Sequence, residues 1–316
     1  MENLAIKPSG GAQERPIETV GLIGLGAVGA LYAQRLHATG AQLLVIADEE
    51  RAARYRREGV LLNGEAIPFR YATPAQAKPV DLLIFATKIG GLGEAMETAA
   101  GFVGPDTLLM CLTNGVTSEG LLAQRFGGQN VLYSIAQGMD AVKEGNAVVY
   151  TRPGTIVLGE REPGPVCVRV HRVADYLTAH DIDVMRAEDV VRRQWSKLMF
   201  NVGINQAVMV FEGTYESVQR EGRPREVMIG AMREAQRLAA LEGYLVSDEE
   251  FDAWLTLTDS LSPSGAPSMR QDGAAHRKSE VELVSGTMLR LADKHGVDVP
   301  VNRWLYEQIA RMEAAY

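Results

Sequence analysis

The sequence predicts an α/β fold in which an N-terminal parallel-sheet domain is followed by an all-helical C-terminal domain. In the first 187 residues, short apolar runs of strand length alternate with helical patterns. After residue 187, the periodic segments have helical spacing. The length of 316 residues suits about two domains. We therefore predict a flexible arm over residues 1–16, a sheet domain over 17–187 and a helical domain over 188–316.

The first elements are a strand, a glycine turn, a helix and a second strand. An apolar run at Thr19–Ile23 ends in glycine, a helical pattern covers residues 27–39, and a second apolar run covers 43–47. This order starts a βαβ unit, which predicts parallel strands covered by helices on both faces.

The rest of the sheet domain repeats the pattern. We predict strands at 80–86, 107–113, 131–136 and 182–185, and helices at 92–100 and 166–178. Residues 147–150 and 155–158, joined by Arg152-Pro153-Gly154, predict a hairpin at the sheet edge.

The helical domain contains five predicted helices. They cover residues 189–211, 225–242, 248–258, 278–295 and 302–314. A segment containing glycine, arginine and proline at 213–224 and a Ser/Pro-rich loop at 260–267 separate them.

Composition excludes several classes of protein. The net charge of −8 is spread along the chain, which argues against a nucleic-acid surface. Cys111 and Cys167 lie in apolar segments without a CxxC or Cys/His cluster, so we expect a reducing compartment and no metal site. The longest apolar runs are too short to cross a bilayer, and residues 1–16 lack the basic start and apolar core of a signal peptide.

A glycine motif directly follows the first predicted strand. Gly24, Gly26 and Gly29 have the spacing G-x-G-x-x-G and open a helix. The first glycine makes a tight turn, the second admits a pyrophosphate, and the third permits close helix–strand packing, while the helix N-terminus favours phosphate. The motif predicts a Rossmann-type dinucleotide site formed by Gly24, Leu25, Gly26, Ala27, Val28 and Gly29.

Asp48, which ends the second predicted strand, bears on the choice of nucleotide. A carboxylate there can accept hydrogen bonds from the adenosine ribose and repel a 2′-phosphate, which favours NAD over NADP. The alternative is that Asp48 only caps the following helix. Arg51 and Arg54 lie close by in the sequence and can still receive a phosphate.

A polar stripe on the first helix of the second domain is the main candidate for catalysis. Lys197, Asn201 and Asn205 fall at i, i+4 and i+8 and share one face of an otherwise largely apolar helix. Burying an ammonium and two amides is costly unless they have partners, so the stripe indicates a site. The alternative is a solvated stripe on a surface helix.

Other polar residues fit the same site. Lys88 and Asn114 each follow a predicted strand, at the carboxyl edge where parallel sheets bind ligands. Taken alone, Lys88 is better explained as an ordinary surface lysine, and Asn114-Gly115 as a plain Asn-Gly turn. Further on, the segment with Ser268 leads into a predicted helix bearing Glu280 and Glu282, which alone indicate solvated charges.

Together these motifs resemble the ketopantoate reductase (2-dehydropantoate 2-reductase) family. The most specific are W-x-K-L-x-x-N-x-x-I-N at 195–205 and P-S-M-x-Q-D…S-E-V-E at 267–282. The resemblance runs from about Val20 to the last helix. It implies a Rossmann domain followed by a helical domain.

The resemblance also implies a role for each matching residue. Lys197 matches the catalytic lysine that protonates the substrate carbonyl oxygen, and Glu280 the acidic residue that holds the substrate hydroxyl and orients the lysine. The positions that match substrate-binding or cofactor-binding residues are Asn201, Asn205, Ser268, Asn114 (which lies near both ligands) and Lys88 (which reaches toward both).

The activity implied is reduction of ketopantoate to (R)-pantoate in the cytoplasm, as a step toward coenzyme A. The family typically has an arginine for the 2′-phosphate of NADPH where this chain has Asp48. The cofactor is therefore NAD, or NADP bound through Arg51 or Arg54. The alternatives are an NAD-dependent D-2-hydroxyacid dehydrogenase of the mandelate type and a non-catalytic nucleotide sensor. A homodimer is possible.

Overall fold

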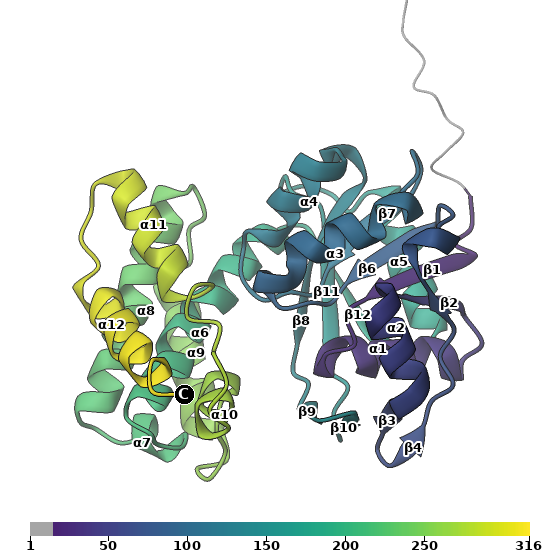
Figure 1. Ribbon diagram of the computed structural model, residues 1–316. Helices are drawn as coiled ribbons and strands as arrows, with labels where there is room; N and C mark the ends of the chain where they lie inside the picture. The colour runs from purple at the N-terminus through teal and green to yellow at the C-terminus, as the bar shows by residue number, and fades with distance from the viewer. Residues whose placement is uncertain (1–14) are drawn as a thin grey trace, which may run out of the picture. The chain divides into compact units, whose positions relative to one another are not determined.

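The computed structural model describes residues 15–316, which form two compact units (Figure 1). The sheet unit consists of the described residues up to Thr113 together with Thr117–Val190. The helical unit consists of Asn114–Val116 and Val191–Tyr316. Most of the arm expected over residues 1–16 lies outside the described residues.

A sheet of eight strands forms the middle of the sheet unit. The strands are β1 (Thr19–Ile23), β2 (Gln42–Ile46), β5 (Tyr71–Ala72), β6 (Leu82–Phe85), β7 (Leu108–Cys111), β8 (Val131–Gln137), β11 (Thr155–Gly159) and β12 (Val184–Ala187). Their order is β12-β11-β8-β7-β6-β1-β2-β5. The central strands are apolar at every position because both faces of the sheet are covered.

The strand order places a topological switch point between β1 and β6. β1 pairs in parallel with β2 on one side and with β6 on the other. Ligands bind to such sheets in the crevice at the carboxyl ends of the strands where the order reverses. The predicted fold class, a Rossmann-type sheet domain followed by a helical domain, is confirmed.

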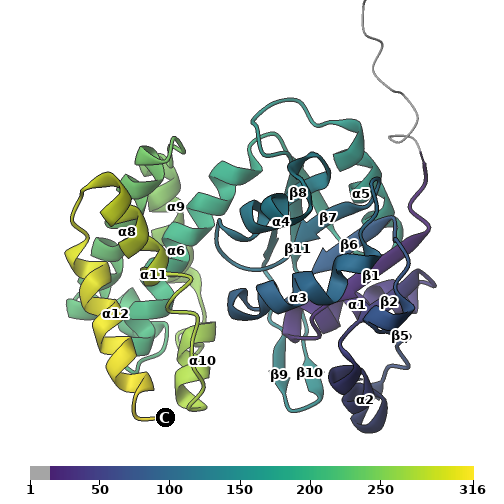
Figure 2. The same cartoon turned by 45° about the horizontal axis from the view of Figure 1, so that its top comes forward.

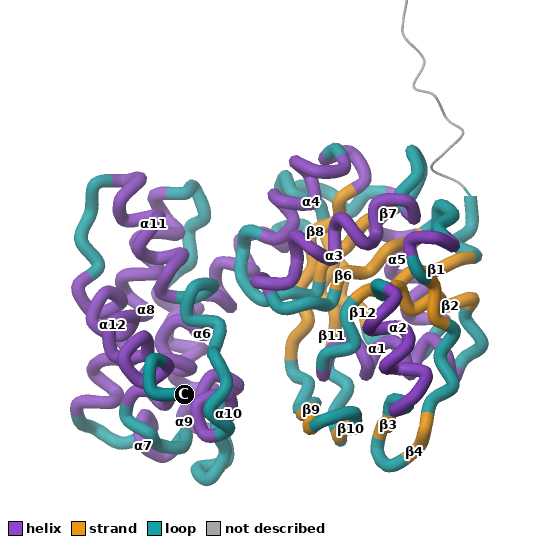
Figure 3. The backbone as a smooth tube through the Cα atoms, viewed as in Figure 1, coloured by secondary structure: helices purple, strands orange, loops and turns teal. Residues whose placement is uncertain are grey.

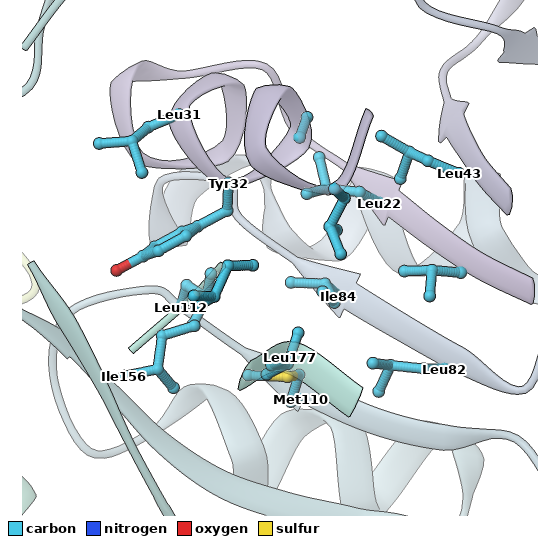
Figure 4. Packing of buried hydrophobic residues seen from close by; sticks show 14 of the residues in the cluster. Leu22, Leu31, Tyr32, Leu43, Leu82, Ile84, Met110, Leu112, Ile156 and Leu177 are labelled. Carbon is cyan, nitrogen blue, oxygen red and sulfur yellow. The ribbon is translucent and has the colours of Figure 1, made fainter. Parts of the chain in front are cut away.

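Helices cover the sheet on both faces. They are α1 (Ala27–Ala38), α2 (Glu49–Glu58), α3 (Leu92–Ala99), α4 (Ser118–Phe126) and α5 (Val168–Ala179). On one face, Leu22 and Ile84 pack in a cluster with Tyr32 of α1 and Leu177 of α5 (Figure 4). On the other face, the buried ring of Phe85 lies 6.3 Å from that of Phe126 in α4. This packing fixes the ends of β1 and β6, which carry the glycine turn and Lys88.

The predicted hairpin of 147–150 with 155–158 is wrong. β10 (Ala147–Val149) instead pairs antiparallel with β9 (Val142–Glu144), and β11 pairs antiparallel with β8 (Figure 2). β9 and β10 are joined by Gly145-Asn146, a two-residue turn that suits a hairpin, with Gly145 at φ +57°. With β3 (Leu61–Leu62) and β4 (Glu65–Ala66) they form a second, four-stranded sheet.

The helical unit contains α6 (Val190–Val210), α7 (Glu216–Gln219), α8 (Arg223–Leu241), α9 (Asp248–Ser260), α10 (Ser268–Ala274), α11 (Ser285–His295) and α12 (Pro300–Glu313) (Figure 3). α6 and α8 approach closely at Gly203, where a Cβ atom would lie 2.4 Å from Met232 Cγ and 2.8 Å from Met228 O. Among the helices of residues 15–316, none is long and apolar enough to cross a membrane.

A buried polar network joins four helices of this unit. Gln206 of α6 accepts a hydrogen bond from the Ser285 hydroxyl of α11. Asn302 of α12 donates to Ala231 O and to a Glu234 carboxylate oxygen in α8, at 3.2 and 2.8 Å. Because each buried polar group has a partner, the network holds α6 in a fixed position at little cost in desolvation.

The predicted helix over 278–295 begins later than expected. α11 starts at Ser285, and residues 280–284 form turns in which the amides of Leu283 and Val284 donate to Glu280 O at 2.9 and 3.2 Å. Glu280 and Glu282 therefore precede the helix, and the prediction that they lie on it is wrong. In this turn Glu280 is half-buried, whereas the prediction had placed it on the solvated face of a helix.

Candidate active site

The glycine turn follows β1 and leads into α1. Gly24 has φ +104°, and a Cβ atom there would lie 2.7 Å from the carbonyl of Ala86, after β6. A Cβ atom at Gly29 would lie 1.8 Å from Gly24 O. These two glycines are thus required by the protein's own packing.

Gly26 is different, because the nearest atom to a Cβ there would be Ala86 O at 3.9 Å. The protein itself leaves room for a side chain at this position. A glycine is needed only if something outside the fold approaches the backbone, as a pyrophosphate does in a dinucleotide site. Gly26 is also the N-cap of α1, whose first turn is uncharged, so its amides suit an anion.

A cavity of about 280 Å³ lies at the switch point, within the sheet unit. Of the residues predicted to bind the cofactor, those that line it are Gly24, Leu25, Gly26, Asp48 and Lys88. Ala27, Val28 and Gly29 begin α1 and do not line it. The cavity, the glycine turn and the switch point fit a nucleotide.

Asp48 occupies the end of β2 and caps α2. One of its carboxylate oxygens accepts from the Arg51 amide at 2.7 Å, and the other from the Arg51 guanidinium at 2.7 Å. The capping alternative is therefore observed. It does not exclude ribose binding, because an ionised carboxylate has further lone pairs and Asp48 also lines the cavity.

Arg51 and Arg54, the two arginines considered as phosphate ligands, differ in their contacts. Arg51 is held between carboxylates, since it also donates to both oxygens of Glu94 at 2.6 and 3.1 Å. The hydrogen bond with Glu94 is the main reason why the pKa of Arg51 is raised. Arg54 is exposed and lies over the ring of Tyr55, 5.4 Å from its centre. Arg51 lines the cavity, whereas Arg54 does not.

Sequence reasoning missed Lys143, which also lines the cavity. It lies on β9, and residues 142–144 carry no strand pattern long enough to recognise. The signal that was available is the Gly145-Asn146 turn, which marks a hairpin and hence the position of Lys143.

In the helical unit, the candidate catalytic residue is Lys197. From α6, its Nζ donates to Asn114 Oδ1 at 3.0 Å. Loss of hydration lowers the pKa of Lys197 to about 8, and the negative charge of Glu280 acts in the opposite direction. The structure thus brings together three residues that are widely separated in the sequence.

The segment Asn114–Val116 groups with the helical unit although it follows β7. Gly115 has φ +99°, and a Cβ atom there would lie 2.6 Å from Leu283 Cδ1. Leu283 belongs to the turn that begins at Glu280. Close packing of these two turns therefore sets Asn114 and Glu280 around Lys197.

Asn205 and Ser268 are also brought together. The Ser268 hydroxyl, at the start of α10, donates to Asn205 Oδ1 at 3.3 Å. Asn201 lies one helical turn after Lys197 and is half-buried, whereas Asn205 is buried. The predicted stripe on α6 therefore forms a line of amides and an ammonium near one another.

An aromatic pair lies on α6 and α9, and sequence reasoning missed it. The rings of Phe200 and Trp254 stack with their centres 4.4 Å apart, and the Trp254 indole donates to Ser196 Oγ at 2.8 Å. Phe200 is three residues after Lys197, so it lies beside the polar stripe.

Within residues 15–316, no group of three or more His, Cys, Asp or Glu side chains is arranged to hold a metal ion.

Comparison with known proteins gives the family. Residues 20–163 match the family described as "Ketopantoate reductase PanE/ApbA", and residues 189–313 match "Ketopantoate reductase PanE/ApbA C terminal". The 2-dehydropantoate 2-reductase of Streptococcus pyogenes serotype M6 is 22% identical over 299 residues, covering 93% of this chain and 97% of the relative. That of Aquifex aeolicus is 24% identical over 301 residues, covering 92% and 96%.

Solved structures share the fold. A D-mandelate dehydrogenase solved with NADH and anilino(oxo)acetate has a TM-score of 0.84 at 20% identity, covering 94% of this chain and 98% of that one. A PanE/ApbA family ketopantoate reductase from Ralstonia eutropha JMP134 has 0.82 at 23% identity (94% and 99%). A dimeric ketopantoate reductase from Staphylococcus aureus has 0.76 at 20% identity (94% and 99%).

These matches cover both units and confirm the predicted resemblance. The two family descriptions together span most of the chain, from the first strand to the last helix. The protein therefore belongs to the ketopantoate reductase family, a family of NAD(P)-dependent oxidoreductases.

Proposed function

We propose that the protein reduces the C2 carbonyl of a 2-oxo acid, and that the acid is ketopantoate, with (R)-pantoate as the product. The observation that carries the proposal is the lysine on α6, whose ammonium is bonded to Asn114 at 3.0 Å and has its pKa lowered to about 8. A lysine that releases its proton near neutral pH is a competent general acid. The relatives named 2-dehydropantoate 2-reductase support this substrate.

The proposed roles follow from the contacts. Asn114 accepts one of the three N–H bonds of Lys197 and so fixes the direction of the other two. Lys197 stabilises the negative charge that develops on the substrate oxygen and then transfers a proton to it. Glu280 favours the protonated lysine by its charge and accepts a hydrogen bond from the substrate hydroxyl. Asn201, Asn205 and Ser268 supply polar groups for the rest of the acid.

The cavity of the sheet unit is proposed to hold NADH or NADPH. Gly24, Leu25 and Gly26 would hold the phosphates, and Asp48 the adenosine ribose, while Lys88 lies at the end of β6 in the same cavity. Asn114 serves the nicotinamide as well as the substrate. The reduced nicotinamide, when bound, supplies the hydride. Asp48 favours NADH, because a carboxylate repels a 2′-phosphate.

The test is nicotinamide oxidation by the purified protein with ketopantoate, using NADH and NADPH in parallel. Turnover is expected with ketopantoate, faster with NADH, and Lys197→Ala should lower kcat by about 10²–10⁴-fold while nucleotide binding persists. Asn201→Ala serves as a second variant, because loss of a substrate contact raises KM more than it lowers kcat. A Lys197→Ala variant as active as the wild type would reject the mechanism, whereas a wild-type protein that binds nucleotide but reduces no 2-oxo acid would leave a non-catalytic sensor.

A second candidate substrate is an aromatic 2-oxo acid reduced with NADH. The observation in its favour is the stacked pair Phe200 and Trp254 beside the stripe of Lys197, which offers a planar surface to an aryl ring. The similar fold of a D-mandelate dehydrogenase that was solved with NADH also supports this candidate substrate. Comparing kcat/KM for phenylglyoxylate and ketopantoate decides between them, and Trp254→Leu should lower only the aryl value.

The proposal extends to the assembly and the compartment. A homodimer is proposed by analogy with the dimeric relative from Staphylococcus aureus, and light scattering of the purified protein measures it. The cytoplasm is proposed as the site of the reaction, because the two cysteines, Cys111 and Cys167, are both free, as a reducing compartment maintains them.

A further inference from the structure

The hairpin of β9 and β10 brings a lysine to the glycine turn from 118 residues away. Lys143 Nζ donates to Leu25 O at 2.5 Å, within the first half of the G-x-G-x-x-G motif. The side chain is partly buried and lines the same cavity as Gly24 and Asp48. The ammonium is thus placed at the turn proposed to hold the phosphates.

The hairpin itself is firmly attached to the sheet unit. Asn146, in its turn, donates to Glu58 O at 2.8 Å and accepts from the Leu61 amide at 2.9 Å. The Tyr150 hydroxyl, just after β10, donates to Gln34 Oε1 of α1 at 2.9 Å. Lys143 is therefore held over the turn by its backbone, and its position does not depend on one hydrogen bond.

No carboxylate in the described part of the chain balances the positive charge of Lys143. Within residues 15–316, its ammonium forms no ion pair and donates to the neutral carbonyl of Leu25, whereas Arg51 in the same cavity lies between Asp48 and Glu94. A partly buried cation without a counter-charge is unfavourable. Loss of hydration, with a smaller effect of Arg54, accordingly lowers the pKa of Lys143. An anion in the cavity would remove this penalty.

We propose that Lys143 is a cofactor-binding residue that donates a charge-assisted hydrogen bond to a phosphate of the dinucleotide. This inference rests on the proposed nucleotide function of the cavity. One N–H bond of the ammonium stays on Leu25 O and two remain for phosphate oxygens. The lysine acts as a point charge opposite the α1 amides, so the phosphate is held from both sides.

The test is isothermal titration calorimetry with three fragments that cannot react. ADP-ribose carries the pyrophosphate, its 2′-phosphate derivative carries one phosphate more, and adenosine carries none. Lys143→Met is expected to bind at least one of the two phosphate-bearing fragments about tenfold or more weakly and to bind adenosine like the wild type. Equal losses on both identify the pyrophosphate, and a loss confined to the derivative identifies the 2′-phosphate.

Two controls accompany the variant. Lys143→Arg keeps the charge and should retain most of the affinity. Lys78→Met removes an exposed lysine of the same unit and should change nothing. Raising the salt concentration should weaken phosphate binding more in the wild type than in Lys143→Met, because one ionic contact is lost.

The inference is overturned if Lys143→Met binds both phosphate-bearing fragments like the wild type, or if it loses no more than Lys78→Met. A wild-type protein that binds ADP-ribose through Lys143 but reduces neither 2-oxo acid would reject the proposed reaction alone. A wild-type protein that binds none of the fragments would reject both.

Discussion

Lys197 is a lysine whose proton is bound less tightly than usual, because α6 and its neighbours remove water from the ammonium. Two groups act on the Lys197 ammonium. The Asn114 oxygen accepts one N–H bond, and the charge of Glu280 partly restores the protonated form. Burial thus lowers the proton affinity of this proposed catalytic residue, and two turns, one after β7 and one before α11, modify its surroundings.

The pH dependence of reduction follows from this. With a pKa of about 8, Lys197 is protonated below that pH and loses its proton above it. As a general acid it must be protonated, so kcat/KM for reduction should fall as the pH rises through about 8, and the reverse oxidation should show the opposite limb. Rates measured from pH 6 to 10 in both directions check this.

Glu280→Gln should move that limb to lower pH, because the Glu280 charge raises the pKa of Lys197. Glu282→Gln is the matched control. Glu282 is exposed, and it accepts a hydrogen bond from Tyr306. An unchanged limb in Glu280→Gln would mean that the two groups are not coupled.

Asp48 caps α2 and is proposed to select the nucleotide, and one substitution separates these two roles. Asp48→Ser keeps a good N-cap for α2 but removes the carboxylate that repels a 2′-phosphate. The ratio of NADPH to NADH in kcat/KM should rise about tenfold, a change equivalent to about 1.4 kcal/mol. Glu49→Ser, one residue later and exposed, should leave the ratio unaltered. A constant ratio in both variants would remove Asp48 as the selector.

Among the elements, the turn containing Asn114 has a steric requirement that can be tested by one substitution. Gly115→Ala would place a Cβ atom against Leu283 at a φ of +99°, so the turn must move. We expect a kcat lower by about tenfold, with a stability loss of about 1–3 kcal/mol from overpacking. Gly120→Ala, on α4 where a Cβ atom meets nothing within 4 Å, is the control. Normal kcat in Gly115→Ala would show that Asn114 does not need this turn.

α6 depends on the buried network for its position. Gln206→Ala removes the nearest of the acceptors of the buried Ser285 hydroxyl, and should lower the free energy of unfolding by about 2 kcal/mol. Gln308→Ala, half-buried on α12, should cost much less. Urea denaturation of the two variants measures the difference, and equal midpoints would argue that water replaces the lost contact.

The sequence predicts most elements of this fold because their patterns are local. The run Thr19–Ile23 and the glycines after it are sufficient for β1 and the turn. The strand at 147–150 was predicted but paired with the wrong partner, because β9 has only three residues, too few for periodicity to appear. The candidate residues divide in the same way. Lys197, Asn201 and Asn205 lie on one helix and share a visible pattern, whereas Lys143 joins the cavity of the sheet unit, and Trp254 the stripe of the helical unit, only through tertiary structure.

For the whole molecule, the cavity proposed to hold the cofactor and the site proposed around Lys197 belong to different units. The residues that line the cavity all lie in the sheet unit. ADP-ribose at a hundred times its Kd should therefore stabilise that unit by about 2.7 kcal/mol. Hydrogen exchange should slow around residues 23–55 and 86–98 and change little over 191–316. Equal protection of residues 191–316 and of the two ranges in the sheet unit would show that the units unfold together.

The brief passage of the chain through the helical unit at Asn114–Val116 has a consequence for recombination between relatives. A chimera spliced once, after Val190, would receive Lys197, the proposed proton donor, from one parent and Asn114, to which its ammonium donates, from the other. Only parents with matching turns at both places would give an active hybrid. The two halves of this gene are therefore expected to be inherited together, and a designer exchanging them must transplant three extra residues from the middle of the first half.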